Sequence, residues 1–277
     1  MSQEQRSPES APRANEMPML GLGTWQNEDP EQCVESVRTA LEMGYRHIDT
    51  AQIYDNEESV GKGIKQADVA REDVFLATKV WKSNLGYDDV IHTTTESLDK
   101  LGVNSVDLLY THWPAGEYDA EDTLSAFAEL KDRGAIDRIG VSNFEPEHLD
   151  AATDALGEAP FANQVECHPL LRQEELREYA DANDVELVGY SPLARGKILD
   201  DPTVGDIAEK HGVSAAQVSL AWLRESGVTA IPKATGENHL SDNWASLGLE
   251  LDDEDIQQID DLGRTDRQLN PDFGPDW

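Results

Sequence analysis

Short apolar runs alternate with amphipathic segments along most of this chain. Eight runs have the length and apolar content of buried strands, and the segments between them place apolar residues at helical spacing. Eight strand-then-helix units predict a parallel (β/α)8 barrel, an α/β fold, and the alternative is a doubly wound open sheet. The strand-like runs cover residues 17–25, 45–50, 74–80, 106–112, 137–143, 162–168, 186–192 and 228–233.

The predicted helices fill the segments between these runs. Several end near a glycine, as helices often do, and Asn56 is expected to cap the helix after the second strand. An insert at about 202–226 has the pattern of two helices. We expect one barrel domain over residues 16–277, with C-terminal helices and a tail at 236–277, after a flexible polar arm at residues 1–15. The clearest helical segments are 31–43, 89–101, 121–133, 147–156, 174–183, 238–247 and 253–262.

Polar side chains stand at or just beyond the ends of three consecutive predicted strands. Asp49 ends one strand and Tyr54 follows it, Lys79 ends the next, and His112 ends the third. Neighbouring strands lie roughly 4.8 Å apart, and barrel enzymes build their active sites at the C-terminal mouth. Singly, each residue is more often a surface ion or a satisfied polar group. Their coincidence at one rim predicts a site.

The charge of the chain disfavours one class of partner. The chain has 277 residues, 56 of them acidic and 22 basic, and its formal net charge of −34 disfavours nucleic acid as a partner. The acids are spread along the whole chain. Adaptation to a high-salt cytoplasm, as in a halophile, is the preferred explanation, because the Debye length falls to about 3 Å at 1 M salt and screens such self-repulsion.

Cysteine content and hydropathy set the expected compartment. Cys33 and Cys167 are too few for a disulfide framework, and their spacing is not that of a metal site, so no metal is expected. No apolar run reaches the roughly 18 residues of a membrane span, and no signal-peptide pattern is present. We expect a cytoplasmic protein without a membrane partner, and we expect it to be monomeric.

Eight short motifs lie at or beside the predicted strands. They are Gly21–Trp25, Arg46–Ala51 with Tyr54, Thr78–Trp81, Leu109–Pro114, Gly140–Phe144, Asn163–Pro169, Tyr190–Leu193 and Ile231–Lys233. Through these ordered motifs the chain resembles the aldo-keto reductase family from about Met17 to Leu262. The resemblance implies a barrel enzyme that reduces aldehydes and ketones with a nicotinamide cofactor, usually NADPH, and uses no metal. Ser191–Lys197 and the short tail look like the microbial diketogluconate and glyoxal reductase-like members, which act on small aldehydes, dicarbonyls and keto-sugars.

By this resemblance, the family's catalytic tetrad corresponds to Asp49, Tyr54, Lys79 and His112. Carbonyl reduction needs a hydride on carbon and a proton on oxygen, and Tyr54 is the expected proton donor. Its unperturbed pKa is about 10, so Lys79 is expected to supply the positive charge that favours the phenolate. Asp49 would keep Lys79 ionised, and His112 would hydrogen-bond the carbonyl oxygen. A histidine bonded to backbone is the alternative for His112.

The resemblance also implies a cofactor site and a substrate pocket. Ser142, Asn143 and Gln164 would hydrogen-bond the nicotinamide carboxamide, and the ring of Tyr190 would stack on the nicotinamide. A capped strand end is the alternative for Gln164. The remaining implied residues are Thr24 and Asp49 on the cofactor side, Ser191 and Leu193 over the pyrophosphate with Lys197 as an additional contact, and Trp25, Trp81 and Trp113 as walls of an apolar substrate pocket.

The segment after the eighth strand bears on the choice between NADPH and NADH. In NADPH-preferring relatives, a lysine, a hydroxyl residue and an arginine surround the 2′-phosphate, and an acid and an asparagine hold the adenine. This chain keeps Lys233, Asp242 and Asn243, but Ala234 lacks a hydroxyl and His239 stands in place of the arginine. Arginine offers a permanent charge and a bidentate fork, which histidine lacks. We expect NADPH to be preferred by a narrow margin, with usable NADH activity.

Two other classes of function fit the same residues. One is a regulatory barrel that binds the cofactor but has little turnover, and an intact tetrad does not exclude it. The other is an unrelated barrel lyase or isomerase that uses Lys79 as a Schiff-base nucleophile. The matches at the implied cofactor site argue against the second. An NADPH-oxidation assay with a simple aldehyde separates the enzyme from the regulatory barrel.

Overall fold

The computed structural model describes residues 12–275 and residue 277. Eight parallel strands form one sheet in which each strand pairs with its neighbours in chain order, from β3 to β10. The sheet closes through parallel bridges between Leu20 and Ala230 and between Gly23 and Lys233. The predicted (β/α)8 barrel is therefore confirmed, and the open sheet is excluded. The strands are β3 (Leu22–Gly23), β4 (His47–Asp49), β5 (Phe75–Val80), β6 (Val106–Thr111), β7 (Ile136–Ser142), β8 (Ala162–Glu166), β9 (Glu186–Tyr190) and β10 (Thr229–Ala230).

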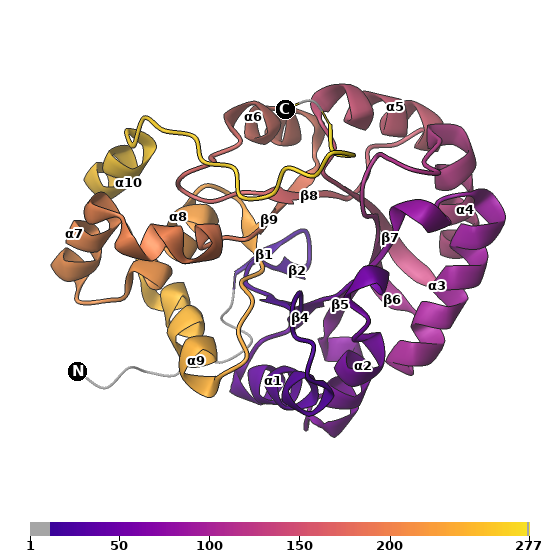
Figure 1. Ribbon diagram of the computed structural model, residues 1–277, viewed down its shortest axis with the longest axis horizontal. Coiled ribbons are helices and arrows are strands. Elements are labelled where there is room, and N and C mark those ends of the chain that lie inside the picture. Colours follow the sequence, from indigo (N-terminus) through magenta and orange to yellow (C-terminus); the bar gives the residue numbers. More distant parts are fainter. Residues whose placement is uncertain (1–11, 276) are drawn as a thin grey trace.

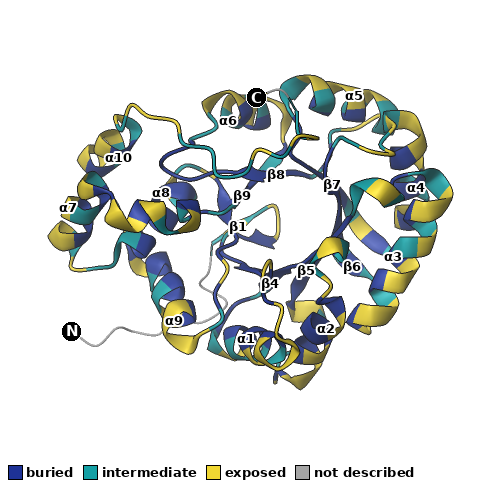
Figure 2. Cartoon of the chain, viewed as in Figure 1, coloured by how far each residue is buried: buried dark blue, intermediate teal, exposed yellow. Residues whose placement is uncertain are grey.

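The helices surround this barrel and turn their buried faces toward it (Figures 1 and 2). Each clear helical segment of the sequence is found within two residues of its predicted ends. Among the described residues, no helix is both long and apolar enough to cross a bilayer. The helices are α1 (Pro30–Met43), α2 (Glu57–Gln66), α3 (Tyr87–Leu101), α4 (Ala120–Asp132), α5 (Pro146–Leu156), α6 (Glu174–Asn183), α7 (Pro202–His211), α8 (Ala215–Glu225), α9 (Glu237–Ala245) and α10 (Asp253–Asp260).

Local sequence sets both ends of α1 and its packing against α9. The carboxylate of Asp29 accepts the amide of Gln32 at 2.8 Å, and Pro30 begins the helix without losing an amide bond. Gly44 ends the helix with φ of 129°. A Cβ at Gly44 would lie 2.7 Å from the ring of Trp244, so glycine lets α9 approach closely.

The first predicted strand, residues 17–25, is only partly correct. Met17–Pro18 (β2) pairs antiparallel with Arg13–Ala14 (β1), and only Leu22–Gly23 joins the barrel as β3. Residues 1–11 of the predicted flexible arm lie outside the described residues, whereas Arg13–Ala14 are in this hairpin. The pairing of β1 with β2 is antiparallel and separate from the barrel sheet, so the apolar pattern of residues 17–25 does not reveal it.

Candidate active site

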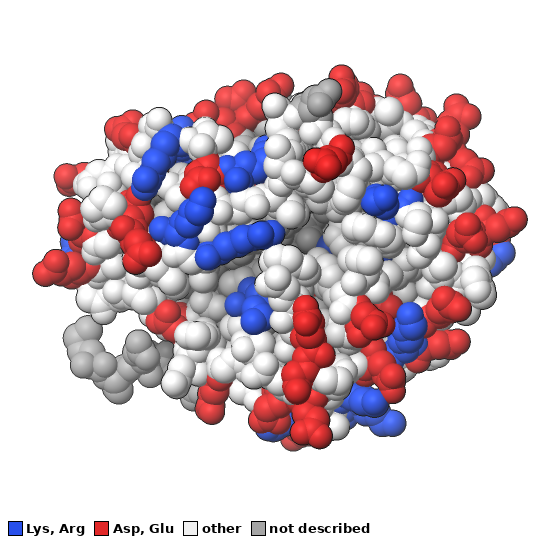
Figure 3. Space-filling model, viewed as in Figure 1, with Lys and Arg blue, Asp and Glu red and all other residues white. Residues whose placement is uncertain are grey.

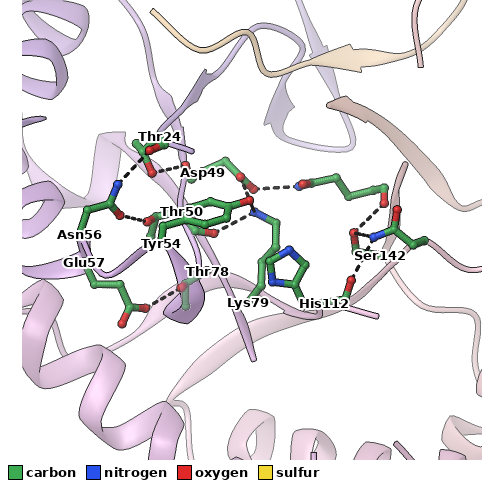
Figure 4. Close-up of polar contacts among 12 residues, drawn as sticks. Thr24, Asp49, Thr50, Tyr54, Asn56, Glu57, Thr78, Lys79, His112 and Ser142 are labelled. Carbon is green, nitrogen blue, oxygen red and sulfur yellow. Dashed lines mark hydrogen bonds and ion pairs between the residues drawn. The ribbon is translucent and has the colours of Figure 1, made fainter. Parts of the chain in front are cut away.

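The ammonium group of Lys79 lies at the centre of a buried polar cluster at the C-terminal ends of β4 and β5. Its Nζ donates a short hydrogen bond to Oδ1 of Asp49, a second to the carbonyl of Thr50 at 2.8 Å, and lies 3.4 Å from the phenol oxygen of Tyr54. Lys79 is fully buried and Asp49 nearly so. Figure 4 shows the carboxylate, ammonium and phenol meeting at one point. Lys79 therefore contacts two of the other three predicted catalytic residues, Asp49 and Tyr54.

A hydrogen-bond network holds the turn that carries Tyr54. Tyr54 ends the 3₁₀-helix Gln52–Tyr54 (η2), and Asp55 follows with a left-handed φ of 54°. Asn56 stands at the N-cap of α2 but makes no capping bond, so its predicted role is wrong. Its amide instead donates to the carbonyl of Thr24 at 2.8 Å and accepts the hydroxyl of Thr50 at 2.8 Å. These bonds tie the Tyr54 turn to β3 and β4.

Burial dominates the electrostatics of the phenol and the ammonium. Desolvation, with a smaller contribution from Asp49, raises the pKa of Tyr54 well above its usual value. The net shift is thus opposite to the lowering that we predicted from Lys79. Desolvation lowers the pKa of Lys79, and Asp49 partly opposes this. Tyr54 consequently keeps its proton at neutral pH, and the adjacent cation stabilises a phenolate only as it forms.

His112 lies beside Tyr54 at the mouth of the barrel. Its ring packs edge-on against the rings of Tyr54 and Trp81, with centroid separations of 5.8 and 5.2 Å. Burial and the nearby Lys79 cation lower the pKa of His112 well below its usual value, so the ring is neutral. Its Nδ1 has no hydrogen-bond partner among the described residues, which gives no support to the alternative of a backbone-bonded histidine. One ring nitrogen of a neutral imidazole can donate to a bound oxygen.

A cavity of about 550 Å³ opens above this cluster. Figure 3 shows the hollow at the centre of one face, with several Lys and Arg side chains beside it and Asp and Glu around the outer edge. Fourteen predicted site residues line the cavity: Thr24, Trp25, Asp49, Tyr54, Trp81, His112, Trp113, Ser142, Asn143, Gln164, Tyr190, Ser191, Leu193 and Lys233. Lys79 lies beneath its floor, bonded to Asp49 and Tyr54. No group of three or more His, Cys, Asp or Glu among the described residues could hold a metal ion.

The predicted nicotinamide-binding residues bond to one another along one wall of this cavity. Nε2 of Gln164 donates to Asp49 at 2.8 Å, and the hydroxyl of Ser142 donates to the carbonyl of Gln164 at 2.7 Å. Asn143, with a left-handed φ of 63°, donates to the carbonyl of His112 at 3.1 Å and accepts the phenol of Tyr190 at 2.8 Å. The Tyr190 ring is thereby fixed in orientation on the cavity wall.

Comparison with known proteins identifies the family. The model of the aldo/keto reductase family matches residues 19–264, which is most of the chain. The chain belongs to the aldo-keto reductase family. It is an oxidoreductase, and the alternative of an unrelated lyase or isomerase is excluded.

The family contains several bacterial relatives close to this enzyme. The glyoxal reductase of Bacillus subtilis is 43% identical, with 93% of each chain covered. The methylglyoxal reductase DkgB of Escherichia coli O157:H7 is 39% identical, covering 94% of this chain and 99% of its own. A crystal structure of a silkworm (Bombyx mori) aldo-keto reductase complexed with NADPH is 31% identical with a TM-score of 0.87, covering 92% of this chain and 87% of that chain.

The loop after β9 has an unusual backbone in this aldo-keto reductase. Ser191, Ala194, Arg195 and Gly196 all have positive φ, from 48° to 94°. Such conformations are costly for residues other than glycine and cluster at ligand sites. The loop borders the cavity, and Arg195 lies 4.8 Å above the ring of Trp25. Arg195 is a cavity residue that our sequence analysis missed, although its neighbours were identified.

The predicted adenosine-phosphate residues are only partly brought together. Lys233 is exposed at the edge of the cavity, whereas His239, Asp242 and Asn243 on α9 do not line it. The two carboxylate oxygens of Asp242 accept bonds from Ser214, the N-cap of α8, and from Gln217 within α8, at 2.6 Å each. Asp242 therefore ties α9 to α8. Lys197, the additional cofactor contact that we predicted, pairs with Asp266 at 2.8 Å.

Two further features of the site were not predicted. Glu57, at the start of α2, is buried beside the cluster, where its Oε1 accepts the hydroxyl of Thr78 at 2.7 Å. An acidic residue in the first turn of a helix is ordinarily an exposed side chain that interacts favourably with the helix dipole. The sequence therefore gives no sign that Glu57 is buried. The polar tail, residues 263–275 and 277, also contributes Leu269, Pro271 and Phe273 to the cavity wall. The sequence signal that could have identified them is the presence of these apolar residues within an otherwise polar segment.

Proposed function

We propose that this enzyme reduces small aldehydes, dicarbonyls and keto-sugars to alcohols with NADPH, and that Tyr54 is the proton donor. The observation that carries the proposal is the contact of the Tyr54 phenol with the buried Lys79–Asp49 pair at the floor of the cavity. The names of the Bacillus and Escherichia relatives support the dicarbonyl substrates. The silkworm complex supports NADPH as the cofactor.

The residues along the cavity wall fit a nicotinamide cofactor. Ser142, Asn143 and Gln164 present polar atoms beside a fixed aromatic ring, that of Tyr190, which suits a flat carboxamide-bearing ring. The loop after β9, with its left-handed backbone, borders the same cavity, and the cations Arg195 and Lys233 line it, so phosphates would be favoured beside them. When bound, the reduced cofactor supplies the hydride that goes to the carbonyl carbon.

The remaining chemistry belongs to the protein. His112 donates a hydrogen bond to the carbonyl oxygen and orients it, because a neutral imidazole keeps one N–H. As negative charge develops on that oxygen, Tyr54 gives it the phenol proton. The resulting phenolate is stabilised by the Lys79 ammonium, which the Asp49 carboxylate holds in place. Solvent then returns a proton to the phenolate.

The substrate enters a mainly aromatic part of the cavity. Trp25, Trp81, Trp113 and Phe273 supply its walls, and the rings of Trp81 and Trp113 each lie nearly perpendicular to the Phe273 ring. Aromatic walls bind the apolar part of a carbonyl compound and exclude water from the reacting oxygen. We infer that small carbonyls need only the part of this pocket next to Tyr54 and His112, which we call the inner pocket.

A turnover assay tests the proposal and separates it from the regulatory barrel. NADPH oxidation is followed with methylglyoxal, an aromatic aldehyde and a keto-sugar, in dilute buffer and in molar KCl, with NADH run in parallel. The proposal predicts turnover with methylglyoxal and a higher kcat/KM with NADPH than with NADH. Tight NADPH binding without turnover of any of these carbonyls would contradict it and favour the regulatory barrel.

A further inference from the structure

The tail runs from the end of α10 past β9 and β8 at the mouth of the barrel (Figure 1). Phe273 is the tail residue whose ring packs against both Trp81 and Trp113 of the cavity wall. The ring of Phe273 lies nearly perpendicular to the rings of Trp113 and Trp81, with centroid separations of 5.4 and 6.0 Å, and the ammonium of Lys82 lies 4.7 Å above it. One wall of the pocket therefore depends on where the tail lies.

A single buried carboxylate on the barrel receives the tail. Glu166, the last residue of β8, is fully buried. Its Oε1 accepts the backbone amide of Gln268 at 2.6 Å and Nε2 of His168 at 2.9 Å. Its Oε2 accepts the backbone amide of Leu269 at 2.8 Å. Two consecutive tail amides are thus bound by the two oxygens of one side chain, at the point where the tail reaches the cavity.

The other polar contacts of the tail are weaker candidates for holding it. The Lys197–Asp266 pair is exposed, and the Arg264–Asp201 pair joins an exposed Arg264 to a buried Asp201 and lies four residues before Gln268. Exposed ion pairs are screened by salt, whereas buried charge-assisted hydrogen bonds are screened much less. The amide of Asp266 also donates to the carbonyl of Leu170 at 2.7 Å. Asp266 precedes Gln268 and Leu269 in the chain, so this contact is farther from Phe273 along the tail.

We propose that Glu166 is a positioning residue for substrate specificity, which holds the tail so that Phe273 completes the wall for larger carbonyls. The inference rests on the proposed carbonyl reduction. Glu166 does not line the cavity and acts through the tail. Small carbonyls react in the inner pocket and do not need this wall.

The variant Glu166→Gln keeps the shape of the side chain and removes one acceptor. The new NH₂ group faces an amide donor, so one tail bond is lost and replaced by a repulsive contact. We expect KM for an aromatic aldehyde to rise about tenfold, the size of one lost hydrogen bond to a charged group. KM for methylglyoxal and for NADPH, and kcat for both aldehydes, stay within about twofold of wild type.

Two companion variants separate the tail contact from general damage. Asp266→Asn breaks an exposed pair on the same tail and is expected to leave both aldehyde KM values unchanged. Gln268→Pro removes one of the two tail amide donors without altering the barrel, and it replaces Glu166→Gln in the kinetic assays if that variant does not fold. It is expected to reproduce the change for the aromatic aldehyde.

A double-mutant cycle with Phe273→Ala tests whether Glu166 acts through the wall. In the Phe273→Ala background, Glu166→Gln is expected to change KM for the aromatic aldehyde no further, because the group that it positions is already gone. Additive effects of the two substitutions would overturn the proposal. So would an equal rise of KM for both aldehydes, or no change in either.

A readout without turnover keeps this inference independent of the proposed function. Trypsin cleavage after Arg267 at native conditions reports opening of the tail. We expect Glu166→Gln to accelerate this cleavage at least about tenfold, and Asp266→Asn to leave it unchanged. Unchanged cleavage in Glu166→Gln would overturn the tail contact, whereas an inactive wild type with this cleavage pattern would refute only the carbonyl reduction.

Discussion

The Lys79 side chain has no contact with solvent, and its ammonium group bonds to Asp49 and to the Thr50 carbonyl. Lys79→Met leaves the buried Asp49 carboxylate without its cation. We expect a loss of about 3–5 kcal/mol in the free energy of unfolding, the usual cost of breaking a buried pair, together with loss of carbonyl reduction. Urea unfolding and NADPH oxidation measure the two effects.

The double variant Asp49→Asn/Lys79→Met is the matched control for this pair. It removes both charges, so it should recover much of the unfolding free energy while remaining inactive. Equal instability of the single and double variants would show that packing, not the uncompensated charge, causes the loss.

Glu57 is a second buried acid, and its pKa is raised by burial, against the opposing effects of Thr78, Ser97, Lys100 and Lys79. A carboxyl whose folded pKa is raised contributes stability below its unfolded pKa of about 4.3 and loses it as pH rises through the folded value. A glutamine at this position has no such loss. The melting temperature of Glu57→Gln minus that of wild type should therefore increase between about pH 4 and pH 8.

Glu58→Gln, one residue along α2 and exposed, is the control for Glu57→Gln. Its melting temperature relative to wild type should not increase over the same pH range. The new amide of Glu57→Gln could change the melting temperature by the same amount at every pH. Such a change would leave the slope of the melting-temperature difference against pH unaltered. A flat difference for Glu57→Gln across this range would show that its burial does not disfavour the charged form.

At the scale of elements, α9 carries the proposed difference between NADPH and NADH. His239 is exposed on α9, and Lys233 precedes the helix at the cavity edge. An arginine in place of His239 would add a permanent charge and a bidentate fork for a 2′-phosphate. His239→Arg is expected to increase the ratio of kcat/KM for NADPH to that for NADH by about tenfold. Initial rates at fixed methylglyoxal measure this ratio.

Asn238→Arg adds the same charge at the neighbouring position of α9 and is the control. It is expected to change the ratio much less, because adjacent residues of a helix point in different directions. A wild-type preference for NADH would refute the cofactor hypothesis outright. Equal effects of the two arginines would indicate a general charge effect on this face.

The elements differ in how far the sequence determines them. The ends of α1 follow from Asp29, Pro30 and Gly44, which act within a few residues. Such local signals can be recognised in the sequence. The docking of the tail depends on Glu166, about a hundred residues away, and no local pattern encodes that contact. The hairpin of β1 with β2 was missed because its pairing is separate from the barrel pattern.

The candidate site shows the same division. The barrel places every strand's C-terminal end at one mouth, so Asp49, Lys79 and His112 could be brought together from the sequence. The direction of the Tyr54 pKa shift could not, because it depends on burial, which outweighs the Lys79 cation. The bonds of Asn56 also differ from expectation, since the Thr24 carbonyl and the Thr50 hydroxyl replace the predicted helix-capping bond.

At the scale of the whole molecule, the net charge of −34 is the dominant property. Acidic side chains cover the outer edge of the face in Figure 3. Their mutual repulsion opposes folding in dilute buffer, and salt shortens its range from about 10 Å at 0.1 M to about 3 Å at 1 M. We expect the melting temperature to rise between 0.1 and about 2 M KCl. An unchanged melting temperature would count against adaptation to high salt.

Carbonyl reduction by this enzyme, as proposed, depends on Tyr54 protonating the carbonyl oxygen from its place beside the buried Lys79–Asp49 pair. The most direct test is the kcat of methylglyoxal reduction by Tyr54→Phe, with NADPH affinity measured on the same preparation. We expect unchanged NADPH affinity and a kcat lower by about 10²–10⁴, the usual contribution of a positioned proton donor. Reduction at the wild-type rate, with the phenol oxygen gone, would contradict this role of Tyr54.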